Sequence, residues 1–265
     1  MRDRIVVVYQ SENNDLGNTL QILKKSLKDR KCEFISRDNL LERDTRNALV
    51  IVAGGDGTFL SSSHRILDGF SVVLGVRLRE TSVGAHLTCD LKDIQKALRV
   101  IDSGVEGNDY RVERRERLEC VMHTGEGNYV RTALALNEFF IGNTCAYYPA
   151  RYSIHIDGTE EYQTSSGILA CTKHGYTGWT KWSNYGKALD WNGHKCFFVR
   201  IREPMGEIYN QNLFTTDSIN IESDMHRGMV VPDSYDEYHF NRGTRVEVRL
   251  SNNPLNVITF PEGKL

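Results

Sequence analysis

The sequence lacks several features that would tie it to nucleic acid or to a membrane. Its 33 basic and 35 acidic side chains give a net charge of −2, so no global charge favours nucleic acid or an anionic lipid surface. No uninterrupted apolar run is long enough to cross a bilayer. The residues before Ile5 lead directly into a strand-like run, so we expect no signal or transit peptide.

Paired cysteines are also missing. The six cysteines are scattered, with no C-x-x-C pair among them, which argues against a zinc site and against a disulfide framework. We therefore expect reduced, mostly buried thiols in a cytoplasmic protein. What the chain does contain is ordinary for a folded globular protein. Its 265 residues are 40% hydrophobic and 26% charged, which suffices for one large domain or two small ones.

The most informative motif is Gly54-Gly55-Asp56-Gly57-Thr58. The preceding run, 49–53, is apolar without polar alternation, which predicts a buried strand of a parallel sheet. Apolar residues from Phe59 onward predict a helix that begins near Thr58. Glycines let the backbone approach an anion closely, and the start of a helix presents unpaired N–H groups. The pattern therefore predicts a phosphate-binding turn.

Asp56 adds a carboxylate to that turn. Beside phosphates it would repel them, unless a metal ion intervened or the carboxylate accepted a proton from an incoming hydroxyl. The plainer alternative is a tight turn in which Asp56 caps the helix.

Two textures divide the chain. Up to about residue 106, strands and helices alternate, which favours a parallel sheet with helices on both faces. After Gly107, successive strand-like runs separated by turn signals predict an antiparallel, sandwich-like sheet. We therefore expect an α/β domain over 1–106 and an all-β domain over 107–265, with room for the last residues to return to the first domain. The predicted strands of the second domain are 111–123, 129–137, 152–156, 167–172, 196–201, 218–222 and 244–250.

Two further stretches could contact a nucleotide. Asn137-Glu138 closes a predicted apolar strand, and an Asn offers a donor and an acceptor together. A simple strand exit with a turn Asn is the alternative. The segment from Thr172 to Trp179 is glycine-punctuated and rich in hydroxyls; Thr177 could hydrogen-bond an adenosine and Trp179 could offer a flat face. Here the alternative is a hairpin loop whose tryptophan, with Trp182 and Trp191, packs the sandwich or a subunit contact.

Taken in this order, these stretches resemble the NAD kinase family. Gly54 to Thr58 is similar to its phosphate loop, Ser82 to Leu87 to its following glycine loop, and Ala135 to Glu138 to its Ala-Leu-Asn-Glu segment. The segment from Cys171 to Trp179 is similar to its Thr/Ser-rich segment. The phosphate loop alone is also similar to those of diacylglycerol kinases, sphingosine kinases and phosphofructokinases.

The sequence departs from the family pattern at several positions. Arg77 stands where most members carry Asn, and Ser165-Ser166-Gly167 stands in place of Gly-Asp-Gly. Gly178-Trp179 replaces Ala-Tyr. These changes resemble a divergent branch that includes the mitochondrial NAD kinases of animals.

The resemblance implies ATP-dependent phosphorylation of the adenosine 2′-hydroxyl of NAD, giving NADP, with Mg²⁺ or another divalent cation. It implies an α/β domain followed by a β-rich domain, in a homodimer or homotetramer. Asp56 would be catalytic or a metal ligand. The remaining implied site residues bind ATP phosphate (Gly54, Gly55, Gly57 and Thr58) or NAD (Asn137, Glu138, Ser166, Thr177, Gly178 and Trp179). A lipid kinase and a non-catalytic NAD(P)-binding protein are the alternatives. ATP or polyphosphate as donor, and NAD or NADH as acceptor, both stay open.

Overall fold

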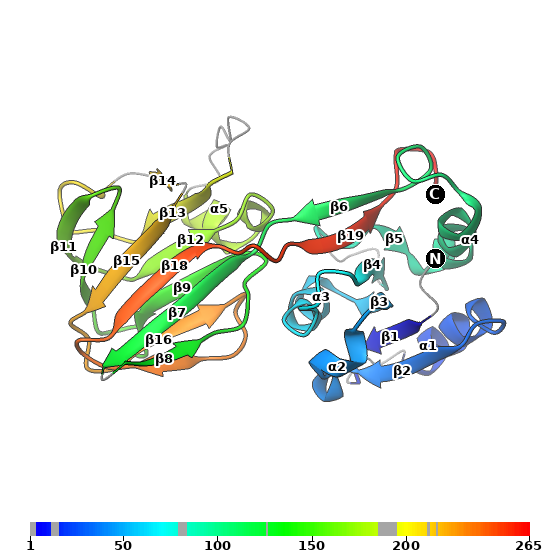
Figure 1. Ribbon diagram of the computed structural model, residues 1–265, viewed down its shortest axis with the longest axis horizontal. Helices are drawn as coiled ribbons and strands as arrows, with labels where there is room; N and C mark the ends of the chain where they lie inside the picture. Colours follow the sequence, from blue (N-terminus) through cyan, green and yellow to red (C-terminus); the bar gives the residue numbers. More distant parts are fainter. Residues whose placement is uncertain are drawn as a thin grey trace. The chain divides into compact units, whose positions relative to one another are not determined.

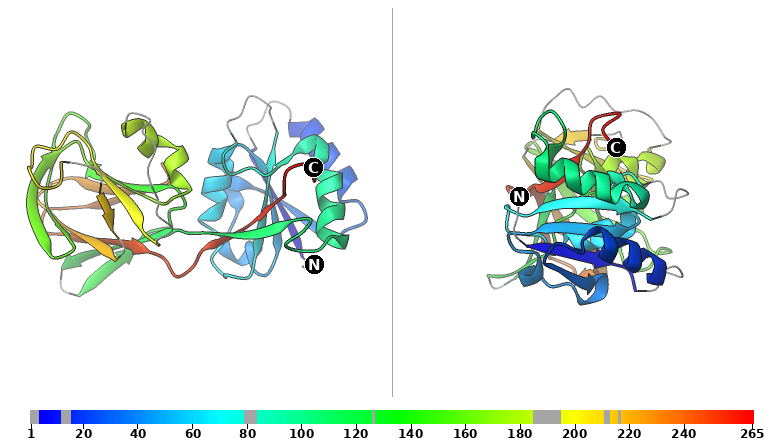
Figure 2. Two further views of the ribbon diagram at one scale, coloured as in Figure 1. Left: turned by 90° about the horizontal axis from the view of Figure 1, so that it is seen from above. Right: turned by 90° about the vertical axis from the view of Figure 1, so that its right-hand side faces the viewer.

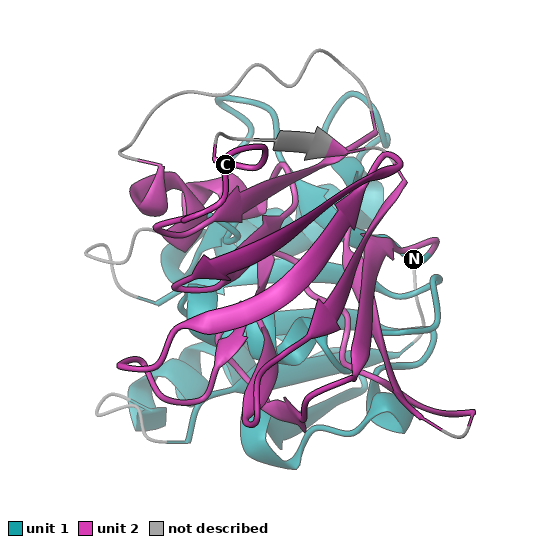
Figure 3. Ribbon diagram, turned by 90° about the vertical axis from the view of Figure 1, so that its left-hand side faces the viewer, with its two compact units in different colours: residues 1–115, 253–265 teal, residues 116–252 magenta. Residues whose placement is uncertain are grey.

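The computed structural model describes residues 4–11, 16–78, 84–125, 127–184, 195–210, 213–215 and 217–265. The chain divides into two compact units (Figure 3). Unit 1 comprises Met1–Arg115 and Asn253–Leu265, and unit 2 comprises Glu116–Asn252. Unit 2 is therefore inserted between two stretches of unit 1, and the last residues of the chain belong with the first.

Unit 1 is built around one sheet with strand order β2-β1-β3-β4-β19-β6, in which β5 also pairs with β4. Its strands are β1 (Ile5–Tyr9), β2 (Cys32–Ser36), β3 (Leu49–Gly54), β4 (Val72–Arg77), β5 (Cys89–Asp90), β6 (Arg111–Arg115) and β19 (Leu255–Thr259). Its helices are α1 (Leu16–Ser26), α2 (Glu42–Thr45), α3 (Asp56–Ser63) and α4 (Ile94–Ser103), with short 3-10 turns η1 (Arg37–Asn39) and η2 (Leu91–Asp93). All pairings in this sheet are parallel except that of β19 with β6.

Helices cover both faces of this sheet. On one face, Leu23 and Leu27 at the end of α1 pack with Ile94 and Leu98 of α4 on the β-strand side chains, including Ile51. Figures 1 and 2 show α3 on the other face. Strand β3 is buried along its whole length, as its unbroken apolar run predicts. The predicted α/β fold with a parallel sheet is confirmed.

Strands β6 and β19 join the first sheet rather than the second. Arg111 to Arg115 was predicted as part of a strand of the β-rich domain, but it pairs antiparallel with β19, from Arg115↔Leu255 to Arg111↔Thr259. Figure 1 shows β19, in red, beside β6. The units accordingly divide after Arg115, whereas the sequence placed the boundary after residue 106.

Unit 2 contains two antiparallel sheets, as predicted. The first has the strand order β11 (Thr159–Ser165), β10 (Ala150–Ile156), β15 (Ser218–Ser223), β18 (Arg245–Leu250), β7 (Leu118–Gly125) and β8 (Asn128–Arg131). The second has the order β14 (Leu213–Thr215), β13 (Phe197–Ile201), β12 (Ile168–Cys171), β9 (Glu138–Asn143), β16 (Gly228–Pro232) and β17 (Tyr238–Phe240). A 3-10 turn, η3 (Gly175–Thr177), and helix α5 (Trp179–Ser183) follow β12.

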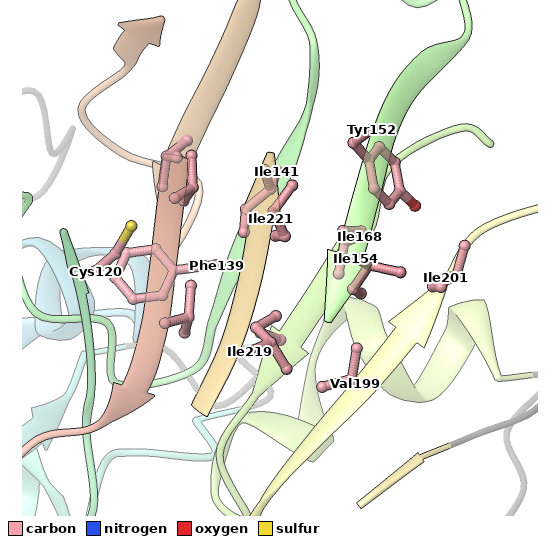
Figure 4. Close-up of a cluster of buried hydrophobic side chains, with 14 of the residues drawn as sticks. Cys120, Phe139, Ile141, Tyr152, Ile154, Ile168, Val199, Ile201, Ile219 and Ile221 are labelled. Atoms are coloured by element: carbon pink, nitrogen blue, oxygen red, sulfur yellow. The ribbon is translucent and has the colours of Figure 1, made fainter. Parts of the chain in front are cut away.

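The core of unit 2 lies between these sheets. Ile154, Ile219 and Ile221 of the first sheet pack in one cluster with Phe139 and Ile168 of the second (Figure 4). Alternate residues of β10 are buried, which is the period expected of a strand with one face on a core. In the described part of the chain, no helix is long and apolar enough to span a membrane.

Candidate active site

The glycine motif lies where the sequence places it, between a buried strand and a helix of unit 1. Strand β3 ends at Gly54, Gly55 is the N-cap in an extended conformation, and α3 begins at Asp56. This start is slightly earlier than the predicted one near Thr58. The N–H of Phe59 bonds to the carbonyl of Gly55 at 3.1 Å. The N–H groups of Asp56, Gly57 and Thr58 therefore precede the first helical hydrogen bond, at the positive end of the helix dipole.

Gly54 is required by the way the turn packs. A Cβ at this position would lie 2.5 Å from Oγ1 and 2.6 Å from Cβ of Thr58. Thr58 is only 2% exposed, and its hydroxyl lies 3.4 Å from Oε1 of Gln10, to which it donates. The buried side chain of Thr58 thus packs against the backbone of the turn. The group that Thr58 can offer to a phosphate is its backbone N–H. Gln10 was not identified from the sequence.

The carboxylate of Asp56 is tied to a second loop of unit 1. Its Oδ1 accepts the N–H of His86 at 2.9 Å, and its Oδ2 accepts the N–H of Ala85 at 3.1 Å. This loop is part of the Ser82–Leu87 stretch singled out above, of which Ser82 and Val83 lie outside the described residues. Each carboxylate oxygen has a further lone pair, so Asp56 can still accept a proton or contact a cation.

His86 connects this loop to an arginine. Its ring stacks on Phe59 of α3, with 5.5 Å between centroids and 9° between planes. Its Nδ1 lies 3.3 Å from Nη1 of the buried Arg115, whose Nε donates to Glu113 at 3.0 Å. Arg115 thus belongs to a chain of polar contacts within unit 1 that runs from His86 to Glu113.

Asn137 and Glu138 lie in unit 2, at the beginning of β9. The prediction that they end an apolar strand over 129–137 is wrong, because β8 stops at Arg131 and Ala135 makes an isolated bridge to Leu118. Both residues are nonetheless buried, with 8% and 4% exposure. The predicted local structure is therefore wrong, and the role of the two residues in binding a nucleotide stays a prediction.

Asp233, which follows β16, accepts hydrogen bonds from the backbone of Asn137 and Glu138. Its Oδ1 accepts the N–H of Asn137 at 2.7 Å and that of Glu138 at 3.2 Å, and its Oδ2 accepts the N–H of Leu136 at 2.8 Å. Its own N–H donates to the carbonyl of Glu138 at 2.9 Å. Asp233 was not identified from the sequence, because nothing local indicates partners that lie 95–97 residues earlier.

The loop after β12 packs directly on the pair. Oγ1 of Thr172 donates to the carbonyl of Leu136 at 2.6 Å, and the N–H of Thr172 donates to the carbonyl of Asn137 at 2.8 Å. A Cβ on Gly175 would lie 2.0 Å from the carbonyl oxygen of Asn137, and one on Gly178 would lie 3.5 Å from its Nδ2. Glycine is therefore needed at 175, whereas a Cβ on Gly178 would make an ordinary van der Waals contact with the Asn137 amide.

Burial changes the chemistry of Glu138. Removal from water, followed by the nearby charge of Asp233, raises the pKa of Glu138 to about 8, against a partial opposing effect of the Thr180 hydroxyl. Oγ1 of Thr180 lies 3.4 Å from Oε2 of Glu138. A buried carboxyl with a raised pKa is typical of functional sites, although structural networks also produce it.

The other predicted nucleotide-binding residues lie around this loop. Thr177 is exposed, and its hydroxyl donates to the carbonyl of His174 at 3.0 Å. Trp179 is 40% exposed. The centroid of its ring lies 5.4 Å from that of Phe140 and 5.1 Å from Cζ of the Arg202 guanidinium. Ser166 is exposed in the turn before β12, at the other end of that strand from Cys171, which pairs with Glu138. Trp191 lies outside the described residues.

A divalent cation is implied by the resemblance, and the residues fit only one mode of binding it. Mg²⁺ in phosphoryl-transfer sites is held by one or two carboxylates, by substrate phosphates and by waters. Asp56 supplies one carboxylate at the glycine turn. Across the residues that the structure describes, no group of three or more His, Cys, Asp or Glu is placed to hold a metal ion. The turn therefore suits a cation that arrives with the nucleotide.

The sequence was compared with those of known proteins and protein families. No protein-family model matches it. It is 29% identical to the NAD kinase of Mycolicibacterium paratuberculosis over 222 residues, which cover 82% of this chain and 68% of that protein. It is 29% identical to the NAD kinase of Mycobacterium tuberculosis over 205 residues, 76% and 64% of the two chains. The chain is therefore similar in sequence to NAD kinases.

This relationship to NAD kinases covers some relatives only in part. Similarity to the NAD kinase of Clostridium kluyveri is 27% over 130 residues, which is 49% of this chain and 43% of that protein. The match thus spans less than half of that relative and less than two thirds of the M. tuberculosis one.

Solved structures show that the fold is also that of NAD kinases. Yeast NADH kinase, solved with NADH, superposes with a TM-score of 0.78 at 16% identity, over 98% of this chain and 84% of that one. The Archaeoglobus fulgidus NAD kinase, solved with ATP, gives 0.73 at 19% identity, over 98% and 94%. The predicted order of an α/β unit and antiparallel β-sheets is therefore the order of NAD kinase structures.

Proposed function

We propose that the chain is an NAD kinase, which transfers the γ-phosphoryl group of ATP to the 2′-hydroxyl of the adenosine ribose of NAD. One observation carries the proposal. The β3–α3 turn combines three glycines, a carboxylate and the first N–H groups of a helix, in a chain that is similar in sequence to NAD kinases. Phosphoryl transfer depends mainly on positioning and on neutralising charge, and this turn offers groups for both.

Asp56 has the central role in this proposal. The ribose oxygen forms a bond to the γ-phosphorus, the bond from that phosphorus to ADP breaks, and the hydroxyl proton leaves. Asp56 orients this hydroxyl and accepts its proton, while the N–H groups of Ala85 and His86 hold the carboxylate in one orientation. The backbone at Gly55, Gly57 and Thr58 binds phosphate oxygens. A Mg²⁺ ion bound with ATP would neutralise part of the phosphate charge.

The second unit supplies the proposed NAD-binding residues. Asn137 and Glu138 are held by Asp233 and Thr172 and lie beside Gly178. Thr177 and Trp179 extend this group with an exposed hydroxyl and a partly exposed ring, which suit an adenosine. Ser166 stays a predicted contact, at the far end of β12. The divergent, mitochondrial-type branch also stays a prediction, based on Arg77, Ser166 and Gly178-Trp179.

The direct experiment incubates the purified protein with NAD, ATP and Mg²⁺ and measures NADP. We expect NADP from the wild type and a loss of at least about 100-fold in kcat for Asp56→Asn, since positioned acid–base groups contribute about 10²–10⁴. Asp102→Asn is the matched control, because Asp102 lies in α4 and pairs with Arg30. Robust turnover by Asp56→Asn would refute the role given to Asp56.

A non-catalytic NAD(P)-binding protein is the second candidate. One observation favours it: both oxygens of Asp56 already accept backbone N–H groups, as they would if the residue served only to fasten the 85–86 loop. This candidate predicts saturable NADP binding, measured by calorimetry, with no turnover of NAD by the wild type. Phosphorylation of diacylglycerol vesicles instead of NAD would identify a lipid kinase.

A further inference from the structure

Unit 2 buries two carboxylates beside each other in very unequal surroundings. Glu138 is 4% exposed and Asp233 is 2% exposed, and their charges act on each other. Two carboxylates so close do not readily ionise together, so one of them holds a proton over a wide pH range. Which one holds it depends on the hydrogen-bond donors and charges around each.

Asp233 is surrounded by donors. Three backbone N–H groups, from Leu136, Asn137 and Glu138, point at its two oxygens at 2.7–3.2 Å. The buried guanidinium of Arg117 interacts with it electrostatically; burial lowers the pKa of Arg117 to about 10, so this side chain is positively charged at neutral pH. Asp233 also takes a left-handed backbone conformation, with φ of +51°, which an aspartate tolerates better than most residues. These contacts hold the Asp233 side chain in one orientation beneath the backbone of residues 136–138.

Glu138 has far less support for a charge. Within the described residues, the Thr180 hydroxyl is the one hydrogen-bond donor to its carboxylate, at 3.4 Å. From β12 it faces the thiol of Cys171, whose pKa burial raises above its ordinary value, so that thiol is neutral. From the η3–α5 turn it faces Gly178 and Thr180, neither of which ionises. From the segment after β16 it faces Asp233, with Arg117 beyond it.

We propose that Asp233 is a positioning residue of the dinucleotide site: its carboxylate accepts three backbone N–H groups, fixes the backbone of Leu136 to Glu138, and leaves the Glu138 carboxyl group as a hydrogen-bond donor to the ligand. This inference rests on the proposed function for its ligand. A neutral Glu138 can donate a hydrogen bond to an acceptor of the nucleotide, and it adds no negative charge beside a ligand whose phosphates are already anionic. Loss of that proton therefore weakens dinucleotide binding.

The first test follows the carboxyl carbons by ¹³C NMR in protein labelled at glutamate. Glu138→Gln identifies the Glu138 signal. In the wild type we expect this signal to titrate several pH units above the exposed glutamates, and in Asp233→Asn we expect its midpoint to fall. Asp236→Asn, an exposed aspartate of the same turn, is the control and should leave the midpoint unchanged. Titration of Glu138 with the exposed glutamates in the wild type would overturn the proposal, even if Asp233→Asn failed to fold.

The second test measures NAD affinity from pH 6 to pH 9.5 by calorimetry. We expect the wild-type affinity to fall by at least about fivefold as pH rises through the Glu138 midpoint, Glu138→Gln to lack this dependence, and Asp233→Asn to shift it to lower pH. A purely structural Asp233 would lower affinity equally at every pH, and that result would overturn the positioning role. Absence of NAD binding with the expected NMR titration would refute the proposed function and leave the location of the proton standing.

Discussion

At the scale of single residues, the glycine turn is a matter of space rather than of flexibility. Gly54 adopts an ordinary strand conformation at the end of β3. It must nonetheless lack a side chain, because Thr58 of the first helical turn lies over its Cα. The buried Thr58 in turn fixes where the first N–H groups of α3 point.

This packing gives a prediction for Gly54→Ala. The added methyl would meet Thr58 at 2.5–2.6 Å, and overpacking of a buried site costs about 1–3 kcal/mol. We expect a loss of that size in the free energy of unfolding, measured by urea denaturation. Gly17→Ala is the control, because Gly17 lies in α1 with nothing within 4 Å of the new methyl; it should be neutral or stabilising. An unchanged stability of Gly54→Ala would contradict the geometry of the turn.

Glu138 gives a prediction about pH and stability. Its pKa is raised from 4.5 to about 8 in the folded protein, so between these values the folded state keeps a proton that the unfolded state has lost. Stability of the wild type therefore falls as pH rises from about 4.5 to about 8. Glu138→Gln does not titrate, so its stability relative to the wild type should improve with pH, by at most about 1.4 kcal/mol per pH unit. Urea denaturation at pH 5, 6.5 and 8 measures this.

The control for this experiment is Glu207→Gln, an exposed glutamate of the same unit. Its stability relative to the wild type should stay nearly constant over the same pH range. If Glu138→Gln behaves in the same way, Glu138 is ionised in the folded protein at neutral pH.

The candidate site was only partly accessible to sequence reasoning. Asp56 and Asn137-Glu138 could be predicted as site residues because their neighbours in the sequence are informative. Asp56 has glycines on both sides, and an apolar run precedes Asn137. Asp233 could not be found, because its role consists of contacts with backbone N–H groups 95–97 residues away. A long-range hydrogen bond leaves no local pattern.

At the scale of elements, local patterns predicted what local forces determine. The apolar run that forms β3, which is buried along its whole length, was predicted correctly. The sequence allowed the last residues to return to the first domain but did not predict β19 as a strand, and β6 was assigned to the wrong sheet. Both are short strands, and their place in the sheet is determined by their pairing with each other. In the sequence, the whole of unit 2 lies between them.

The position of β19 leads to a prediction about the end of the chain. Val257 and Ile258 are buried between β4 and β6. Removing residues 253–265 would expose one edge of each neighbour, so we expect unit 1 to lose cooperative unfolding and to become sensitive to proteases. Removing only 261–265 is the control and should have a small effect. Far-UV circular dichroism and limited proteolysis provide the measurement, and an intact unit 1 without β19 would contradict the sheet order.

At the scale of the whole molecule, the two units have separate cores. The chain passes from unit 1 to unit 2 after Arg115 and returns to unit 1 after Asn252. Unit 2 is one continuous stretch, and its two ends are neighbours: Leu118 of β7 pairs with Leu250 of β18. Such a unit has what is needed to fold by itself.

We therefore expect residues 116–252, expressed alone, to fold. The measurement is a cooperative thermal transition with a β-rich circular dichroism spectrum. Residues 1–115 alone should not fold as well, because they lack β19; joining Arg115 to Asn253 by a short linker should restore folding, since Arg115 and Leu255 are paired. A molten 116–252 fragment would show that its core depends on unit 1.

The late position of β19 in the chain also has a consequence for biosynthesis. A ribosome delivers β4 well before β19, the strand that completes its edge, because the whole of unit 2 is translated between them. Unit 2 is fully translated before that moment and can reach its native state first. The nascent protein must keep an open, apolar strand edge from aggregating throughout this interval, so its yield in cells should depend on chaperones that act during translation.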